Sequence, residues 1–230
     1  MFRPGWKSLM TPLEVKIGLV FFLLYYLVFP RLNALLQQRL FGDGEVLVPE
    51  ANVLYYVLLF LVVFFLFHRF LREDFFGLLD WLPENLAAAG LCLLLAGAAR
   101  ILLSFLPLPV EDLIAQQYAE QFHASPFPTL ALILILIPLV EETLYRGLLY
   151  GLMRRFDKKL AIVVSILFYG LSLVWRYAYE AGDPSLFLLS LLYLPLSAAA
   201  TLCYEAGGSV WAAALVHEGY NGLLLFMALH

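Results

Sequence analysis

Long apolar segments dominate this chain and constrain its fold more than any other feature. Seven of them approach the length of about 20 mostly apolar residues that a helix needs to cross the hydrocarbon core of a membrane. Of the 230 residues, 63% are hydrophobic and 14% are charged, whereas soluble domains have about 45–50% and about 25%. The sequence therefore predicts an all-α polytopic membrane bundle of about 7–8 transmembrane helices. The seven segments are residues 13–32, 52–68, 83–106, 127–150, 160–178, 185–203 and 209–229.

Lys and Arg residues are unevenly distributed between the two ends of this expected bundle. If the N-terminus is cytoplasmic and the spans alternate, nine of the 14 basic residues are cytoplasmic, three are on the other side, and Arg100 and Arg146 lie within spans. Cytoplasmic loops carry the excess of basic residues, so we expect this orientation, with the C-terminus outside. The nine are Arg3, Lys7, Lys16, Arg69, Arg72, Arg154, Arg155, Lys158 and Lys159, and the three are Arg31, Arg39 and Arg176.

The joins between the apolar segments contain no internal repeat and no low-complexity linker, so we interpret residues 1–230 as one integral membrane domain. We expect a multi-pass protein of a bacterial cytoplasmic membrane, in contact with membrane lipids. No basic stripe or nucleic-acid motif is present, so no nucleic-acid partner is expected. Residues 109–124 place Leu113, Ile114 and Tyr118 at helical spacing. They predict an amphipathic helix on the outer interface, with a polar loop as the alternative.

Polar groups inside the fourth segment need a partner or a function, because charges at bilayer depth are costly. Glu142 and Arg146 are four residues apart and share a helix face, so they can pair. Glu141 is turned about 100° away from Glu142. One carboxylate is therefore interpreted as structural, and the other is free for chemistry.

The seventh segment contains a second polar pair. His217 and Asn221 in "VHEGYN" lie four residues apart and point the same way, at a depth similar to that of Glu141. Such groups often act only as interhelical hydrogen bonds. Intramembrane carboxylates also mark proton-coupled carriers, but carriers usually have repeated halves.

These residues resemble the motifs of a known family. "EETLYR" is similar to the E-E-x-x-x-R motif of the CAAX protease and bacteriocin-processing (CPBP, Abi) family of glutamate-type intramembrane proteases, and "HEGYN" resembles its H-x-x-x-N motif. The family's third motif, F-x-x-x-H, aligns with "ILFYGLSLVW", where Phe168 matches and Ser172 replaces the histidine. The resemblance covers about residues 127–225.

The resemblance implies an intramembrane endopeptidase that hydrolyses a peptide bond of a membrane-associated or lipidated substrate. Glu141 would activate water, and His217 and Asn221 would stabilise the oxyanion. Glu142 would orient the site through Arg146. The family fold implies a helix bundle with a polar intramembrane cavity that opens toward the cytoplasm or its equivalent. No cofactor is expected.

The serine at position 172 leaves three alternatives open. The protein is a slower protease, or another group such as Tyr169 or Glu218 replaces the histidine, or it is a catalytically impaired scaffold or bacteriocin-immunity protein. Zinc needs three or four ligands. Without a histidine at position 172, the ligands fall to His217 and glutamates, so no metal is expected.

Overall fold

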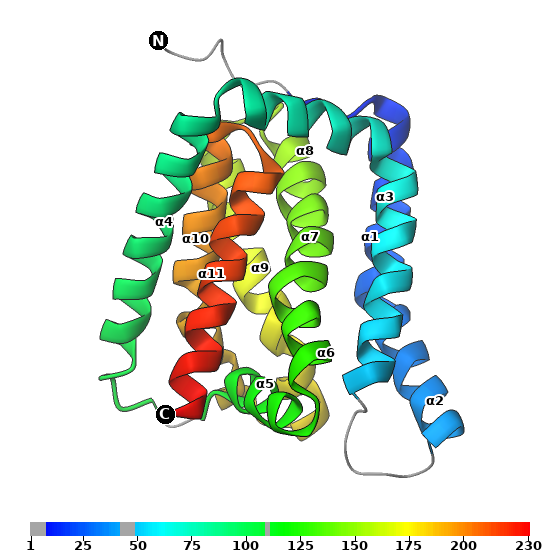
Figure 1. Cartoon of the computed structure of the whole chain (residues 1–230), viewed down its shortest axis with the longest axis vertical. Coiled ribbons are helices and arrows are strands. Elements are labelled where there is room, and N and C mark those ends of the chain that lie inside the picture. The colour runs from blue at the N-terminus through cyan, green and yellow to red at the C-terminus, as the bar shows by residue number, and fades with distance from the viewer. Residues whose placement is uncertain (1–7, 42–48, 109–110) are drawn as a thin grey trace.

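The computed structural model describes residues 8–41, 49–108 and 111–230, and every regular element within these ranges is helical. Figure 1 shows most helices standing side by side, with α5 lying across one end. The predicted all-α membrane bundle is confirmed. The helices are α1 (Pro12–Leu27), α2 (Phe29–Phe41), α3 (Pro49–Asp80), α4 (Leu82–Leu103), α5 (Leu113–Ala124), α6 (Pro126–Ala131), η1 (Leu132–Leu136), α7 (Ile137–Glu142), η2 (Thr143–Tyr150), α8 (Gly151–Met153), α9 (Lys158–Ala181), η3 (Pro184–Leu189), α10 (Ser190–Gly207) and α11 (Val210–Leu229).

Six helical stretches of the described residues are long and apolar enough to cross a membrane, and the pair α1–α2 makes a seventh if it is counted as one span. That pair bends by 47° at its break. The six stretches and the pair coincide with the seven predicted segments, but α3 continues well beyond residue 68. It bends at Phe67, where φ is −117° and ψ is 18°. Beyond the bend, α3 lies across the end of the bundle (Figure 1).

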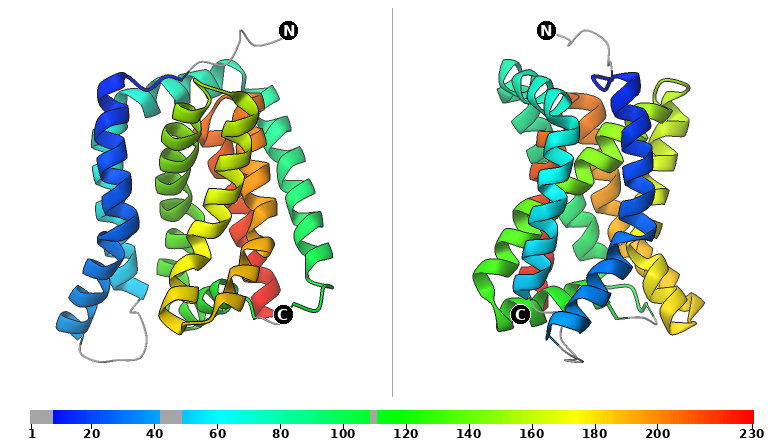
Figure 2. Two further views of the ribbon diagram at one scale, coloured as in Figure 1. Left: turned by 180° about the vertical axis from the view of Figure 1, so that it is seen from behind. Right: turned by 90° about the vertical axis from the view of Figure 1, so that its right-hand side faces the viewer.

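The bundle has two ends, which we name the α8 end and the α5 end. The α8 end holds the start of α1, the α8–α9 turn and the α10–α11 turn, whereas the α5 end holds α2, α5 and the end of α11 (Figures 1 and 2). Six of the nine basic residues predicted to be cytoplasmic belong to the α8–α9 turn, the start of α9 and the bent part of α3. Lys16 lies in α1, and Arg3 and Lys7 are outside the described residues. Which end faces the cytoplasm stays a prediction.

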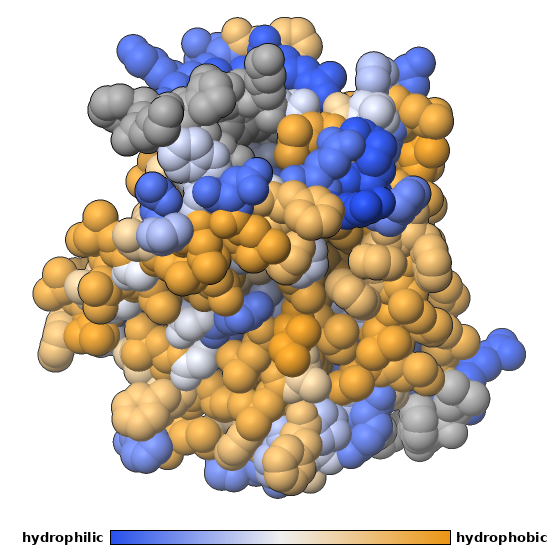
Figure 3. All heavy atoms as spheres, turned by 45° about the horizontal axis from the view of Figure 1, so that its top comes forward, coloured by the Kyte–Doolittle hydropathy of each residue, from blue (hydrophilic) through white to orange (hydrophobic). Residues whose placement is uncertain are grey.

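The outer surface of the helices is apolar, as a membrane span requires. Phe65, Leu94 and Leu102 are among many large hydrophobic side chains that are exposed. In Figure 3, hydrophobic residues cover most of the sides of the bundle and hydrophilic residues gather toward its ends. The polar groups of the site described below are instead buried between the helices.

Helix α5 is held at its end of the bundle by a partly buried carboxylate. Asp112 caps α5 by accepting from the backbone N–H of Ala115, at 3.1 Å. Arg100 of α4 donates to the same carboxylate at 2.6 Å, and the Tyr193 hydroxyl of α10 donates at 2.5 Å. The predicted amphipathic helix is thus present from Leu113 onward, while residues 109 and 110 lie outside the described residues.

Candidate active site

The span that carries Glu141 has unusual helix geometry on both sides of that residue. It runs without a break from α6 to α8, and two stretches of it, η1 and η2, are π-helical. Stretches of π-helix are rare in proteins, and those that occur are often found at functional sites. The apolar pattern of this span gave no sign of them, because a buried apolar run looks the same in either helix type.

Glu142 connects two helices through one carboxylate oxygen. Its Oε1 accepts from Nη1 of Arg146 at 3.0 Å, which is the pair that the spacing predicted. The same Oε1 lies 2.9 Å from Nδ1 of His217. Arg146 also donates to the backbone oxygen of Ser197, at 3.0 Å. Because these side chains are almost fully buried, each charge depends on its partners to offset the loss of water.

Glu141 points away from this pair and is held by two phenols. The hydroxyl of Tyr25 in α1 donates to Oε1 at 3.0 Å, and the hydroxyl of Tyr169 in α9 donates to Oε2 at 2.9 Å. The Glu141 residue is only 6% exposed. An ionised carboxylate offers about four acceptor sites, so two hydrogen bonds leave it able to accept more.

Tyr169 links the two halves of the site. Its hydroxyl oxygen also lies 3.2 Å from Nε2 of His217, and the Arg146 guanidinium lies over its ring, 4.5 Å from the centroid. Polar contacts therefore run without interruption from Arg146 through Glu142, His217 and Tyr169 to Glu141. From the sequence, Tyr169 was considered only as one of two groups that could replace the histidine missing at position 172.

The Ser172 hydroxyl is engaged outside that chain of contacts. Its hydroxyl donates to the backbone oxygen of Tyr169 at 2.7 Å and accepts from the Tyr145 hydroxyl at 2.8 Å. The Phe168 ring packs against Tyr145, with 6.2 Å between centroids. Glu218, the other replacement considered from the sequence, is half-buried in α11 and is absent from the linings of both cavities described below.

Asn221 faces the same region from α11. One N–H of its side-chain amide donates to the backbone oxygen of Ile133 in η1, at 2.8 Å. A side-chain amide has two N–H donors, so a second donor remains for another group. The structure therefore brings together Glu141, His217 and Asn221, as the sequence predicted, but with Asn221 already partly engaged.

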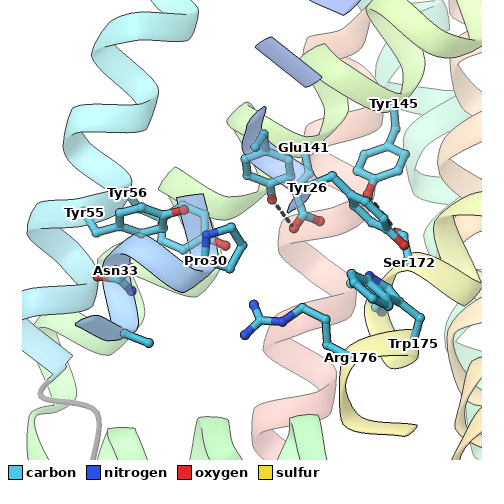
Figure 4. A pocket seen from close by; sticks show the side chains of 13 residues that line it. Tyr26, Pro30, Asn33, Tyr55, Tyr56, Glu141, Tyr145, Ser172, Trp175 and Arg176 are labelled. Atoms are coloured by element: carbon cyan, nitrogen blue, oxygen red, sulfur yellow. Dashed lines mark hydrogen bonds between the residues drawn. The ribbon is translucent and has the colours of Figure 1, made fainter. Parts of the chain in front are cut away.

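Two cavities meet at Glu141. The first, of about 220 Å³, lies between α1, α2, α3, η2 and α9, and Figure 4 shows Glu141 facing it together with Ser172 and Arg176. The second, of about 200 Å³, lies between α5 and Glu141 and is also lined by His217 and Asn221. Tyr56 of α3 borders both. Both cavities have room for water beside the Glu141 carboxylate, which lines both of them.

Metal binding was a further alternative from the sequence. Within residues 8–41, 49–108 and 111–230, no group of three or more His, Cys, Asp or Glu side chains is placed to hold a metal ion. A zinc site built on His217 would need such a group.

Comparison with known families identifies the region that contains these residues. A family model described as Rce1-like, type II CAAX prenyl endopeptidase, matches residues 123–223. This region of the chain is therefore similar to the Rce1-like family. The match confirms the resemblance seen in the sequence and supports a CAAX-type intramembrane endopeptidase. Neither the curated proteins nor the solved structures give a match to this chain.

The Rce1-like region contains most of the site but not all of it. Glu141, Tyr169, His217 and Asn221 lie within residues 123–223. Tyr25, which donates to Glu141, lies in α1 and outside the match. Sequence reasoning missed Tyr25, because it is one of many aromatic residues in the apolar first span. Only the packing of α1 against η2, which continues the Glu141 helix, brings it to Glu141.

Proposed function

We propose that the protein is an intramembrane endopeptidase in which Glu141 activates water to hydrolyse a peptide bond of a membrane-associated or lipidated substrate. The observation that carries the proposal is the position of Glu141. It is a buried carboxylate at the junction of two cavities, and Tyr169 connects it to His217. A general base needs this combination of access to water and a route for its proton.

The proposed reaction begins with a water molecule hydrogen-bonded to Glu141. Glu141 takes one proton while the water oxygen bonds to the carbonyl carbon, and the electron pair of the C=O bond moves to the oxygen. The proton then passes from Glu141 to the amide nitrogen, the C–N bond breaks, and a carboxylic acid and an amine are released. Positioned acid–base groups of this kind contribute about 10²–10⁴-fold in rate.

The oxyanion would be held by donors from α11. The second side-chain N–H of Asn221 is one donor. The other is Nε2 of His217, which carries a proton only when the ring is the imidazolium, because the Nδ1 proton already faces Glu142. The imidazolium would then exchange Tyr169 for the substrate oxygen. Glu142 fixes the imidazole through Nδ1 at 2.9 Å. One preorganised donor of this kind is worth about 10²–10³-fold, and here the ring needs only to change its partner.

Tyr169 replaces the missing histidine of the family motif in this proposal. A phenol has one proton, which it can give either to Glu141 or to Nε2 of His217, and it lies within hydrogen-bond distance of both. It can therefore relay a proton between them during the reaction. Ser172 is left with a supporting role against Tyr145.

A second candidate is a catalytically impaired protein that acts as a membrane scaffold or bacteriocin-immunity protein. The observation that favours it is Ser172, whose hydroxyl bonds to Tyr145 and the backbone rather than to Glu141. In that case cleavage is absent, and Glu141→Gln leaves the biological effect unchanged.

The test is cleavage of an internally quenched peptide with a prenylated cysteine three residues from its C-terminus, by protein reconstituted in liposomes. Wild type should cut it and Glu141→Gln should not. The matched control is Glu218→Gln, which alters a half-buried glutamate outside both cavities and should cut at a near wild-type rate. Cleavage by none of the three proteins on a panel of such peptides would favour the impaired alternative.

A further inference from the structure

We propose that Arg176 binds a carboxylate of the substrate, about three residues away from the peptide bond that Glu141 hydrolyses. The proposal rests on the endopeptidase function proposed above, and it adds a residue that selects the substrate. Arg176 lies in α9, close to two helical turns beyond Tyr169. An acidic group at a fixed position would then be part of what the site recognises.

Arg176 projects into the cavity that contains Glu141. It is part of the lining of the first cavity, and Figure 4 shows its guanidinium extending from α9 into the space below Glu141. Its side chain is 37% exposed, so part of it is open to a ligand. Among the described residues, no other Lys or Arg lines either of the two cavities. Arg176 is therefore the basic side chain that an anionic group beside Glu141 would meet.

The carboxylate that Arg176 now contacts is easily exchanged. Nη2 of Arg176 lies 3.4 Å from Oε1 of Glu180, whose side chain is 64% exposed. Exposed pairs of this kind contribute little to stability, and a guanidinium has five N–H donors. By contrast, Arg100 and Arg146 are almost fully buried and hold their carboxylates at 2.6 Å and 3.0 Å. A substrate carboxylate can therefore replace Glu180 or bind beside it.

A carboxylate is the anion of a peptide that best matches this side chain. The planar guanidinium is always charged and binds a carboxylate through two parallel hydrogen bonds. Trp175 lines the cavity beside Arg176 and stacks on Tyr26, with 5.2 Å between ring centroids. Opposite charges attract more strongly where such apolar surfaces exclude water. The cavity therefore favours an ion pair more than an open protein surface does.

The spacing of residues along α9 sets the position of this carboxylate on the substrate. Tyr169 and Arg176 are seven residues apart in one helix, so they leave it on the same face, about 10 Å apart along its axis. Tyr169 donates to Glu141, which fixes the reacting end of this distance. An extended peptide covers about 3.3–3.6 Å per residue. About three residues therefore separate the scissile bond from the carboxylate.

Two sources of carboxylate satisfy this spacing. One is the free C-terminus of a chain that is cut three residues before its end. The other is the side chain of an aspartate at the third residue of a longer chain. Both present the same anion to Arg176, but the first restricts cleavage to chain ends and the second does not. The substrates of the experiment below separate them.

The first test compares three quenched peptides that differ only at the third residue after the prenylated cysteine. The first peptide ends there with a free carboxylate, the second ends there with an amide, and the third has an aspartate there and an amidated end. Wild type in liposomes should prefer a carboxylate peptide to the plain amide by about 10–10²-fold in kcat/KM, the range for hydrogen bonds to charged groups. Arg176→Gln should lose this preference. Which carboxylate peptide is preferred identifies the source.

The matched control is Arg72→Gln, because Arg72 is an exposed arginine that lines neither cavity. It should keep the wild-type preference. A preference that survives in Arg176→Gln, even at a lower overall rate, would overturn the proposal. Equal cleavage of the three peptides by the wild type would do the same.

The second test measures binding and does not depend on cleavage. Fluorescent forms of the three peptides are titrated into Glu141→Gln and into the double variant Glu141→Gln with Arg176→Gln. A carboxylate peptide should bind the single variant about 10–10²-fold more tightly than the plain amide, and the double variant should bind them equally. If the wild type cuts none of the peptides, the endopeptidase function fails, and binding still decides the role of Arg176. Equal binding of all three peptides to Glu141→Gln would contradict that role.

Discussion

The Tyr169 hydroxyl oxygen lies 2.9 Å from Oε2 of Glu141 and 3.2 Å from Nε2 of His217, so one phenol connects the proposed base to the proposed oxyanion donor. The two residues come from spans far apart in the sequence. Removing this hydroxyl should therefore disturb both at once.

Tyr169→Phe should lower kcat by about 10²-fold, the lower range for an acid–base group, and it should leave the fold intact because the ring remains over Arg146. The measurement is peptide cleavage per folded protein in liposomes. Tyr150→Phe is the control, since Tyr150 also donates its hydroxyl to a glutamate, Glu205, but lies outside both cavities. Wild-type turnover by Tyr169→Phe would remove Tyr169 from the mechanism.

Ser172→His tests whether the family histidine is merely missing. If position 172 were a vacancy in a working site, the new imidazole should raise activity by about 10²-fold. In the proposed mechanism Tyr169 already fills that role through its contacts with Glu141 and His217, and Ser172 is engaged with Tyr145. We therefore expect no gain, and a loss if the larger ring crowds the first cavity. A rise in turnover in the cleavage assay would show that Tyr169 does not replace the histidine.

Arg146→Ala should destabilise the protein strongly, because it leaves Glu142 buried without its cation. Breaking a buried pair typically costs about 3–5 kcal/mol, which should appear as a lower melting temperature and yield in detergent. The control Arg176→Ala removes a partly exposed pair with Glu180, for which about 0–1 kcal/mol is expected. Equal melting temperatures for the two variants would refute the structural assignment of Arg146.

The parts of this site that follow from local spacing could be predicted from the sequence. The Glu142–Arg146 pair needs only residues four apart on one helix, and the common face of His217 and Asn221 has the same origin. The contact between His217 and Glu142 could not be predicted, because it depends on how α11 packs against α7.

The hydrogen bond from Tyr25 to Glu141 could not be predicted from the sequence either. It lies 116 residues from Glu141 in sequence, in a span where aromatic residues are common. The bend of α3 at Phe67 and the π-helical stretches were missed for a related reason, since apolar periodicity does not record local backbone geometry. The span positions, by contrast, depend mainly on length and hydropathy, and they were predicted closely.

The most direct test of the division between the two glutamates compares Glu141→Gln with Glu142→Gln, by measuring both melting temperature and kcat/KM in the same preparation. We expect Glu141→Gln to keep a melting temperature near that of the wild type and to lose activity by about 10²–10⁴-fold, because it removes only the base. We expect Glu142→Gln to lower the melting temperature, because Arg146 and His217 lose their shared anion. Cleavage by Glu141→Gln at the wild-type rate would contradict the account.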